Sequence, residues 1–404
     1  MEELIFFAAL LVFGYGLVSA LADRSPITAP MVFVTVGIVA SPLGLDLLTV
    51  DADSEAVQVI AKVTLVMILF TAASTIDLRR LKTEYPIPLR LLGIGLPLMM
   101  LLGILVASWL FTDTGFWLVA IMALILSPTD AALAQTVVGS DRVPAPVRDA
   151  ISVESGLNDG IALPPIMACI AAAGTQGALT DPGHWGLYAA LQIALGPLAG
   201  ALIGWFGGVL IDRAVEREWM EPVYQRLASF ALAVLCYSLA ELAGGNGFIA
   251  AFIGGLMLGA RSPRVRERIQ EFGEAEGQQL ALFVFVIFGL AMVPMVIDHI
   301  DGLALVYALL SLTVIRMLPV TLSLVGSGLG APGVAFIGWF GPRGIASILY
   351  TLILIGQLGV DGNERILSVI VLTILLSIFA HGISAIPLSS WYARQAQLKK
   401  ESSR

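Results

Sequence analysis

Charge is scarce in this chain of 404 residues: 13% of them are Asp, Glu, Lys or Arg, whereas 58% are hydrophobic. Soluble domains average about 25% charged residues, so the composition excludes an ordinary soluble fold and indicates a protein of the lipid bilayer. The net charge of -8 is spread along the chain and leaves no basic face of the kind that binds nucleic acid. We therefore expect the bilayer as a partner and no nucleic acid.

Cysteine and histidine are also rare, with two and three copies respectively. Cys169 and Cys236 lie in apolar runs, so the sequence predicts no disulfide framework. The spacings C-x-x-C and H-E-x-x-H are absent, and we expect neither a transition-metal site nor a cofactor. His381 lies in the last apolar run, where a hydrogen-bonded packing role is favoured over a proton relay.

Long apolar runs, by contrast, fill the sequence. About thirteen of them approach the ~20 residues that a spanning helix needs, which predicts an all-α polytopic membrane protein. The start, Met1-Glu2-Glu3, lacks the basic residues of a signal peptide, so the first run is expected to be a retained helix. The approximate limits are 4–22, 28–44, 56–77, 86–111, 115–139, 149–173, 185–211, 225–243, 246–260, 278–297, 302–325, 332–358 and 365–391.

The positive charges predict the orientation of these runs. Basic residues such as Arg80 and Arg394 follow odd-numbered runs, whereas acids such as Asp51 and Asp181 follow even-numbered ones. Loops rich in Lys and Arg stay in the cytoplasm. We predict a cell (inner) membrane protein with its N-terminus outside and a short cytoplasmic tail at 392–404. Lys62, near the outer end of the third run, is interpreted as snorkelling to the surface.

Two acids lie where a membrane protein bears the highest cost for them. Asp130 and Asp159 are both flanked by long apolar runs, and a carboxylate at the centre of a spanning helix costs roughly 2.5–3.5 kcal/mol on insertion scales. Such residues persist when they pair, line water, or carry an ion or proton. The pair therefore indicates a transporter, and we treat residues 1–404 as a single membrane transporter domain.

Two proline-containing breaks suggest an internal repeat. Ser127-Pro128-Thr129-Asp130 interrupts the fifth run and Gly341-Pro342-Arg343-Gly344 interrupts the twelfth, because proline removes a backbone donor and clashes with the preceding turn. We predict two six-helix repeats, 4–173 and 225–391, that a linker helix at 185–211 places in inverted orientation, with broken helices 5 and 12 crossing at the midplane. Asp130 can then face the positive helix ends and Arg343 the negative ones.

The sixth run supplies further polar groups at about the same depth. Ser155 and Asp159 are four residues apart and share one helix face. Together with Thr129 and Asp130 they would form an oxygen-rich pocket, which suits a hard cation such as Na⁺; a carboxylate can also take a proton. Nothing in this set suits a transition metal.

The adjacent face of the same helix carries Glu154 and Asn158. Glu154 needs a partner, and Arg316 in the eleventh run is the best candidate by depth. A buried pair of this kind fixes geometry more than it adds stability, so we interpret Glu154–Arg316 as a structural ion pair.

These motifs resemble the NhaP-type branch of the monovalent cation:proton antiporters, and animal sodium/proton exchangers are similar. The resemblance covers essentially all thirteen runs. It implies that Asp159 is the shared carrier of cation and proton, that Thr129, Asp130 and Ser155 line the site, and that Asn158 supports it. A neutral Asn before the acid implies electroneutral exchange of one cation for one proton, and the family is typically a homodimer.

One departure concerns the third run, where many relatives have Phe-Glu and this chain has Phe70-Thr71. An acid near the site is thus missing, which bears on the preference for the cation. From the resemblance as a whole we expect an antiporter, and no enzyme, that exchanges Na⁺ or Li⁺ for H⁺ by alternating access. A K⁺/H⁺ antiporter is the nearest alternative, because ligand types do not fix the size of the ion. A cation channel and a membrane-embedded aspartyl hydrolase are more distant alternatives.

A glycine ladder in the seventh run allows close helix packing, within a subunit or between subunits: Gly196, Gly200, Gly204 and Gly208.

Overall fold

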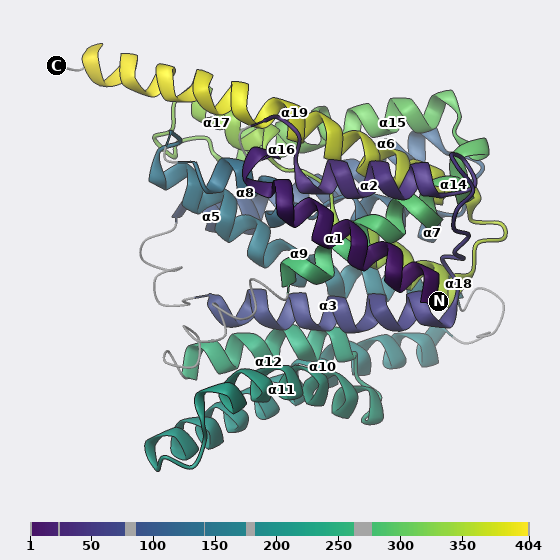
Figure 1. Cartoon of the computed structure of the whole chain (residues 1–404), viewed down its shortest axis with the longest axis vertical. Coiled ribbons are helices and arrows are strands. Elements are labelled where there is room, and N and C mark those ends of the chain that lie inside the picture. The colour runs from purple at the N-terminus through teal and green to yellow at the C-terminus, as the bar shows by residue number, and fades with distance from the viewer. Residues whose placement is uncertain are drawn as a thin grey trace. The chain divides into compact units, whose positions relative to one another are not determined.

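The computed structural model describes residues 2–22, 25–76, 86–140, 142–174, 182–261 and 277–402, and within these ranges it is helical without a strand (Figure 1). The described helices are α1 (Glu2–Ala22), α2 (Ala29–Ala40), α3 (Glu55–Thr75), α5 (Pro86–Arg90), η1 (Leu91–Gly95), α6 (Leu96–Leu110), α7 (Phe116–Ile125), α8 (Ala131–Val138), α9 (Ala145–Gly174), α10 (Pro182–Glu216), α11 (Pro222–Leu242), α12 (Gly247–Arg261), a helix at 277–287, η2 (Phe288–Met292), α14 (Val293–Val296), η3 (Ile297–His299), α15 (Gly302–Leu312), α16 (Val314–Ser323), α17 (Ala331–Trp339), α18 (Ile345–Leu358) and α19 (Glu364–Ser402).

The predicted all-α polytopic fold is confirmed. Among the described residues, eight helices are long and apolar enough to cross a membrane by length and composition, and shorter apolar helices account for the remaining predicted runs. α19 continues as a helix through most of the predicted tail, to Ser402. The inverted relation of the two repeats stays a prediction, as does the single-domain assignment.

The two predicted breaks are present. α7 ends before Pro128 and α8 begins only at Ala131, while α17 ends at Trp339 and α18 begins only at Ile345. A third break was not predicted. Thr313 separates α15 from α16 with φ -114° and ψ -89°, and its hydroxyl donates to the carbonyl of Leu309 at 2.6 Å, a back-bond that bends helices.

Two π-helical turns were also not predicted, and both have the same physical origin. η1 directly precedes Pro97 in α6, and η2 directly precedes Pro294 in α14. A proline ring clashes with the carbonyl four residues earlier in a regular helix. The wider turn of the π-helix relieves that clash without ending the helix.

The chain forms two compact units. The first comprises residues 1–58, 85–155 and 281–404, and the second comprises residues 59–84 and 156–280. In the first unit, α2 and η2 approach closely through two glycines: a Cβ on Gly37 would lie 2.7 Å from the carbonyl oxygen of Val286, and Gly289 lies against the backbone of α2. α19 packs along α15 and α8 of the same unit.

The second unit is built around the glycine ladder of α10. Its glycines lie against successive turns of α12, which places the ladder contact within one subunit and answers the question that the sequence left open. On its other side α12 presents Gly255 and Gly259 to the backbone of α3 at Phe70 and Ser74. Lys62 on α3 is exposed, in agreement with snorkelling.

We predict that Gly204→Ala lowers the thermal stability of the detergent-solubilised protein. A Cβ at this position would lie 2.7 Å from the Cα of Gly254, and overpacking of this kind costs about 1–3 kcal/mol. Gly14→Ala on α1 is the matched control, because a Cβ there meets nothing within 4 Å. An unfolding temperature that falls equally in both variants would contradict the close contact between α10 and α12.

Candidate ion-binding site

The two breaks meet at Asp130. Its backbone N–H donates to the carbonyl of Pro342 at 2.8 Å. One carboxylate oxygen accepts from the amide of Leu133 at 3.0 Å, and the other accepts from the amide of Ile345. Since these amides belong to the first turns of α8 and α18, a single buried carboxylate caps the N-termini of both helices.

Gly344 makes this arrangement possible. A Cβ at Gly344 would lie 2.7 Å from the carboxyl carbon of Asp130, so any larger residue would push the carboxylate away from α18. Ser347, on the first turn of α18, donates to the carbonyl of Ile125 at 2.8 Å and so ties α18 to the end of α7.

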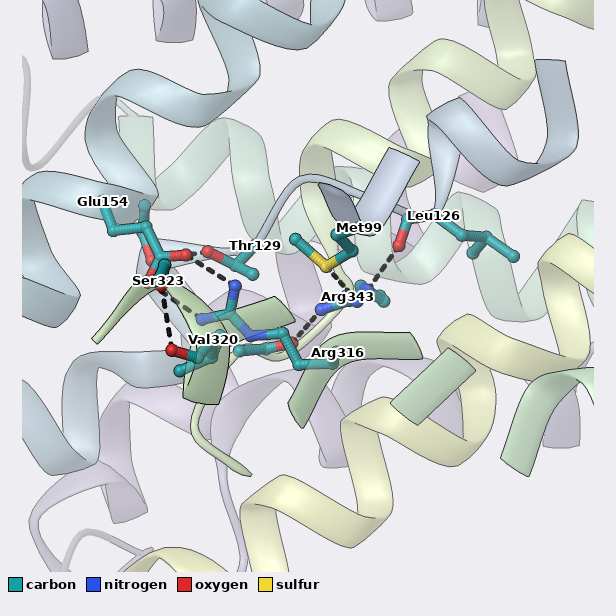
Figure 2. Close-up of polar contacts among 10 residues, drawn as sticks. Met99, Leu126, Thr129, Glu154, Arg316, Val320, Ser323 and Arg343 are labelled. Carbon is teal, nitrogen blue, oxygen red and sulfur yellow. Dashed lines mark hydrogen bonds and ion pairs between the residues drawn. The ribbon is translucent and has the colours of Figure 1, made fainter. Parts of the chain in front are cut away.

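Arg343 is the positive counterpart of Asp130, and Figure 2 shows its contacts with Leu126 and Met99. Its Nε donates to the carbonyl of Leu126 at 2.5 Å, and its Nη1 donates to the carbonyl of Gly341. Leu126 is the C-cap of α7 and Gly341 lies two residues beyond the end of α17, so the guanidinium lies close to the negative ends of both helix dipoles. The side chain is fully buried, and its Nη2 lies 3.4 Å from the sulfur of Met99.

A second buried charge pair lies beside the breaks. Figure 2 shows Arg316 pointing toward Glu154, and the two form a two-point ion pair with N–O distances of 2.5 and 2.9 Å. The side chains are 1% and 2% exposed. Arg316 lies in the first turn after the break at Thr313, and its guanidinium packs on Gly341, where a Cβ would lie 2.7 Å from Cζ. The pair therefore connects α9 to α16.

The remaining predicted site residues divide between the two units. In the first unit, the hydroxyls of Thr129 and Ser155 share a buried hydrogen bond of 3.0 Å, next to the cap that Asp130 provides. Asn158 and Asp159 follow on α9 in the second unit, with Asn158 buried and Asp159 half-buried. α9 runs without a break from Ala145 to Gly174, so Asp159 lies one turn beyond Ser155 on the same helix face.

The residue after Asp159 packs against α12 of the second unit. That residue, Gly160, lies directly against the ring of Phe252 on α12, which leaves no room for a side chain there. α12 also contacts the backbone of Phe70, next to Thr71 on α3. Thr71 is half-buried.

Two polar residues of α19, Ser377 and His381, contact the second break in the first unit. Of these, the sequence pattern had identified only His381. Ser377 accepts from the backbone amide of Arg343 at 2.6 Å. His381, interpreted as a packing residue, contacts Ser377 and the carbonyl of Trp339. The four-residue spacing of Ser377 and His381, which places both on one helix face, is the signal that could have identified Ser377.

Comparison with known proteins identifies the family. Residues 7–391 match the family described as sodium/hydrogen exchanger, transmembrane.

The chain belongs to the sodium/hydrogen exchanger family. The predicted NhaP-type resemblance is confirmed, and the family consists of exchangers rather than enzymes. The chain is 27% identical over 387 residues to the K(+)/H(+) antiporter NhaP of Alkalimonas amylolytica, covering 94% of this chain and 65% of that protein. It is 24% identical over 373 residues to the K(+)/H(+) antiporter NhaP2 of Shewanella oneidensis, covering 91% and 63%. The chain thus spans slightly less than two thirds of the length of these relatives.

Two further proteins resemble this chain. The Na(+)/H(+) antiporter of Schizosaccharomyces pombe is 24% identical over 336 residues, which cover 73% of this chain and 71% of that protein. The solved structure of the sodium proton antiporter MjNhaP1 from Methanocaldococcus jannaschii matches with a TM-score of 0.78 at 19% identity. It covers 97% of this chain and 98% of that one, so the two proteins share a fold.

We predict that Asp130→Asn loosens both helix ends at once. The amide retains one acceptor oxygen but turns an NH₂ group toward a backbone N–H, and an unsatisfied buried donor costs about 1–3 kcal/mol. Hydrogen–deuterium exchange should accelerate at the amides of both Leu133 and Ile345. Asp113→Asn, which changes an exposed acid, is the control. The amide that faces the new NH₂ group should accelerate most, and unchanged exchange at both amides would show that the carboxylate does not cap these helices.

For the ion pair, we expect Glu154→Ala to be far more damaging than the double change Glu154→Gln with Arg316→Gln. Removing one partner leaves a buried unpaired charge, which costs about 3–5 kcal/mol. The double variant leaves two neutral groups that can still form a hydrogen bond. The yield and melting temperature of monodisperse protein measure this difference, and equal losses in the two variants would contradict a structural role for the pair.

Proposed function

We propose that this chain is a secondary active antiporter that exchanges a monovalent cation for H⁺ across the cell (inner) membrane. Family membership supports exchange as the activity, and the site supports a small hard cation as the substrate. The observation that carries the proposal is the hydroxyl pair of Thr129 and Ser155, 3.0 Å apart, with Asp159 one turn further along α9. The substrates are the cation and the proton, and no resident cofactor is proposed.

Asp159 is the proposed carrier, which binds either Na⁺ (or Li⁺) or H⁺ but never both. Hydroxyl and carboxylate oxygens are ligands that such cations prefer, and Thr129, Ser155, Asp130 and Asp159 would supply them. Asn158 would support the site as a neutral hydrogen-bonding neighbour. Alternate exposure of the site to the two membrane faces then couples the outward and inward fluxes.

The charge inventory favours electroneutral exchange. Asp130 is committed to two helix N-termini, and Glu154 is neutralised by Arg316. Asn158 adds no charge. If Asp159 alone alternates between cation and proton, one positive charge moves in each direction per cycle, and membrane potential neither drives nor opposes the exchange.

Na⁺ is the cation that we favour, and K⁺ is the second candidate. The bacterial relatives are named as K⁺/H⁺ antiporters, whereas the fission yeast relative is named as a Na⁺/H⁺ antiporter and MjNhaP1 as a sodium proton antiporter. Thr71 offers a neutral oxygen where many relatives have an acid, so the preference of this chain must be measured. We further propose a homodimer, with the N-terminus outside and the C-terminus in the cytoplasm.

The test is a pH-gradient assay in proteoliposomes, with Na⁺, Li⁺ and K⁺ compared and the membrane potential either clamped or imposed. We expect Na⁺ and Li⁺ to dissipate the gradient at a rate that an imposed potential leaves unchanged. Asp159→Asn should abolish the signal, because an amide can neither bind a proton nor balance a cation. Asp298→Asn, at an exposed acid, should retain it. Cation-driven proton movement by Asp159→Asn would refute the carrier assignment.

A further inference from the structure

α19 holds both sides of the second break through one chain of hydrogen bonds. The backbone N–H of Arg343 donates to Ser377 Oγ at 2.6 Å. Ser377 Oγ lies 3.1 Å from His381 Nδ1, and His381 Nε2 lies 2.9 Å from the carbonyl oxygen of Trp339. Ser377 and His381 are 0% and 2% exposed. This series of hydrogen bonds therefore runs from Arg343, within the second break, to Trp339, the last residue of α17.

Each ring nitrogen of His381 faces a carbonyl oxygen: Nε2 faces that of Trp339, and Nδ1 lies 2.9 Å from that of Ser377 as well as 3.1 Å from Ser377 Oγ. A carbonyl oxygen only accepts, so the single proton of a neutral imidazole serves one of the two carbonyls. With the proton on Nε2, the ring donates to Trp339 and Nδ1 accepts from the Ser377 hydroxyl, and only this tautomer connects α19 to the last residue of α17. In either tautomer the Ser377 hydroxyl oxygen accepts from the Arg343 N–H.

These links matter because the amides of Gly341 and Arg343 donate to no carbonyl four residues earlier: Gly341 donates to Trp339, and Arg343 donates to Ser377. Arg343 holds carbonyls at the end of α7 and just beyond α17 with its guanidinium, and the position of its backbone sets where that guanidinium lies. Two residues later, Ile345 receives the cap from Asp130. α19 thus fixes from one side the same segment that Asp130 fixes from the other.

We propose that Ser377 and His381 are positioning residues for exchange: they hold Arg343 and the second break in the geometry that the ion site requires. The proposal rests on the proposed antiport function for its transport consequence, but its structural part stands independently. Neither residue touches the transported ion in this proposal; both act through Arg343 and, beyond it, through the cap of Asp130 on α18.

The decisive measurement is residue-resolved hydrogen–deuterium exchange at the Arg343 amide in Ser377→Ala. This change removes one hydroxyl and no carbon, so the protein should fold. Loss of the single acceptor should accelerate exchange at that amide by about tenfold, as expected when a hydrogen bond worth ~1.5 kcal/mol is lost. Thr373→Ala is the matched control, because Thr373 is equally buried one turn earlier on α19 and its hydroxyl bonds only within that helix.

Transport kinetics and a conservative rescue separate positioning from simple packing. Ser377→Ala and His381→Leu should raise the apparent KM for the cation several-fold, because the cap of α18 shifts with the break. His381→Gln should recover most of the wild-type KM, since its amide can both donate to Trp339 and accept from Ser377. Thr373→Ala should leave KM unchanged.

Unchanged protection of the Arg343 amide in Ser377→Ala would overturn the proposal, as would equal effects of Ser377→Ala and Thr373→Ala. Failure of His381→Gln to perform better than His381→Leu would also count against it. If the wild-type protein exchanged no cation at all, the antiport proposal would fail, yet the amide measurement would still decide whether α19 holds the break.

Discussion

Compensation of helix dipoles at the two breaks is the interaction on which the site depends. Each unwound helix ends inside the first unit, and each end carries about half an elementary charge. Asp130 caps the N-termini of α8 and α18, so one negative charge offsets two positive half-charges. Arg343 donates to the C-cap carbonyl of α7 and to the carbonyl of Gly341 just beyond α17, so its positive charge lies at the negative end of α7 and close to that of α17. Without these two residues, buried amides and carbonyls would be left unsatisfied.

The same electrostatic logic explains why a third and a fourth charge are buried nearby. Glu154 and Arg316 join α9 to α16 through a two-point pair that is almost fully enclosed. Replacing such a pair with apolar residues often costs nothing, so its value here lies in geometry. It fixes α9 two turns after the start of that helix, immediately before Ser155.

The broken helices and their charges could be predicted from the sequence, because a proline close to Asp or Arg inside an apolar run strongly favours an interrupted membrane helix. The break at Thr313 could not. A threonine that back-bonds to its own helix is common in membrane spans and usually leaves the helix continuous. The π-helical turns before Pro97 and Pro294 could not be predicted either, because a kink, a break or a wider turn can each relieve the clash between a proline ring and the preceding helical turn. The helix that packs against the glycine ladder depends on tertiary structure. Four glycines at this spacing predict that another helix approaches closely, but only the fold shows that this helix is α12.

Differences in bond strength indicate which contacts can yield during transport. The caps of Asp130 and the contacts of Arg343 involve buried charges, so separating α8 from α18 would cost several kcal/mol. The crossing should therefore move as one body. The hydrogen bond between Thr129 and Ser155 is different, because it joins two neutral hydroxyls and contributes only about 0.5–1.5 kcal/mol. Under the proposed function, a cation that enters between these oxygens would replace one weak bond with two ion–dipole contacts, while the charged framework around it would keep its geometry.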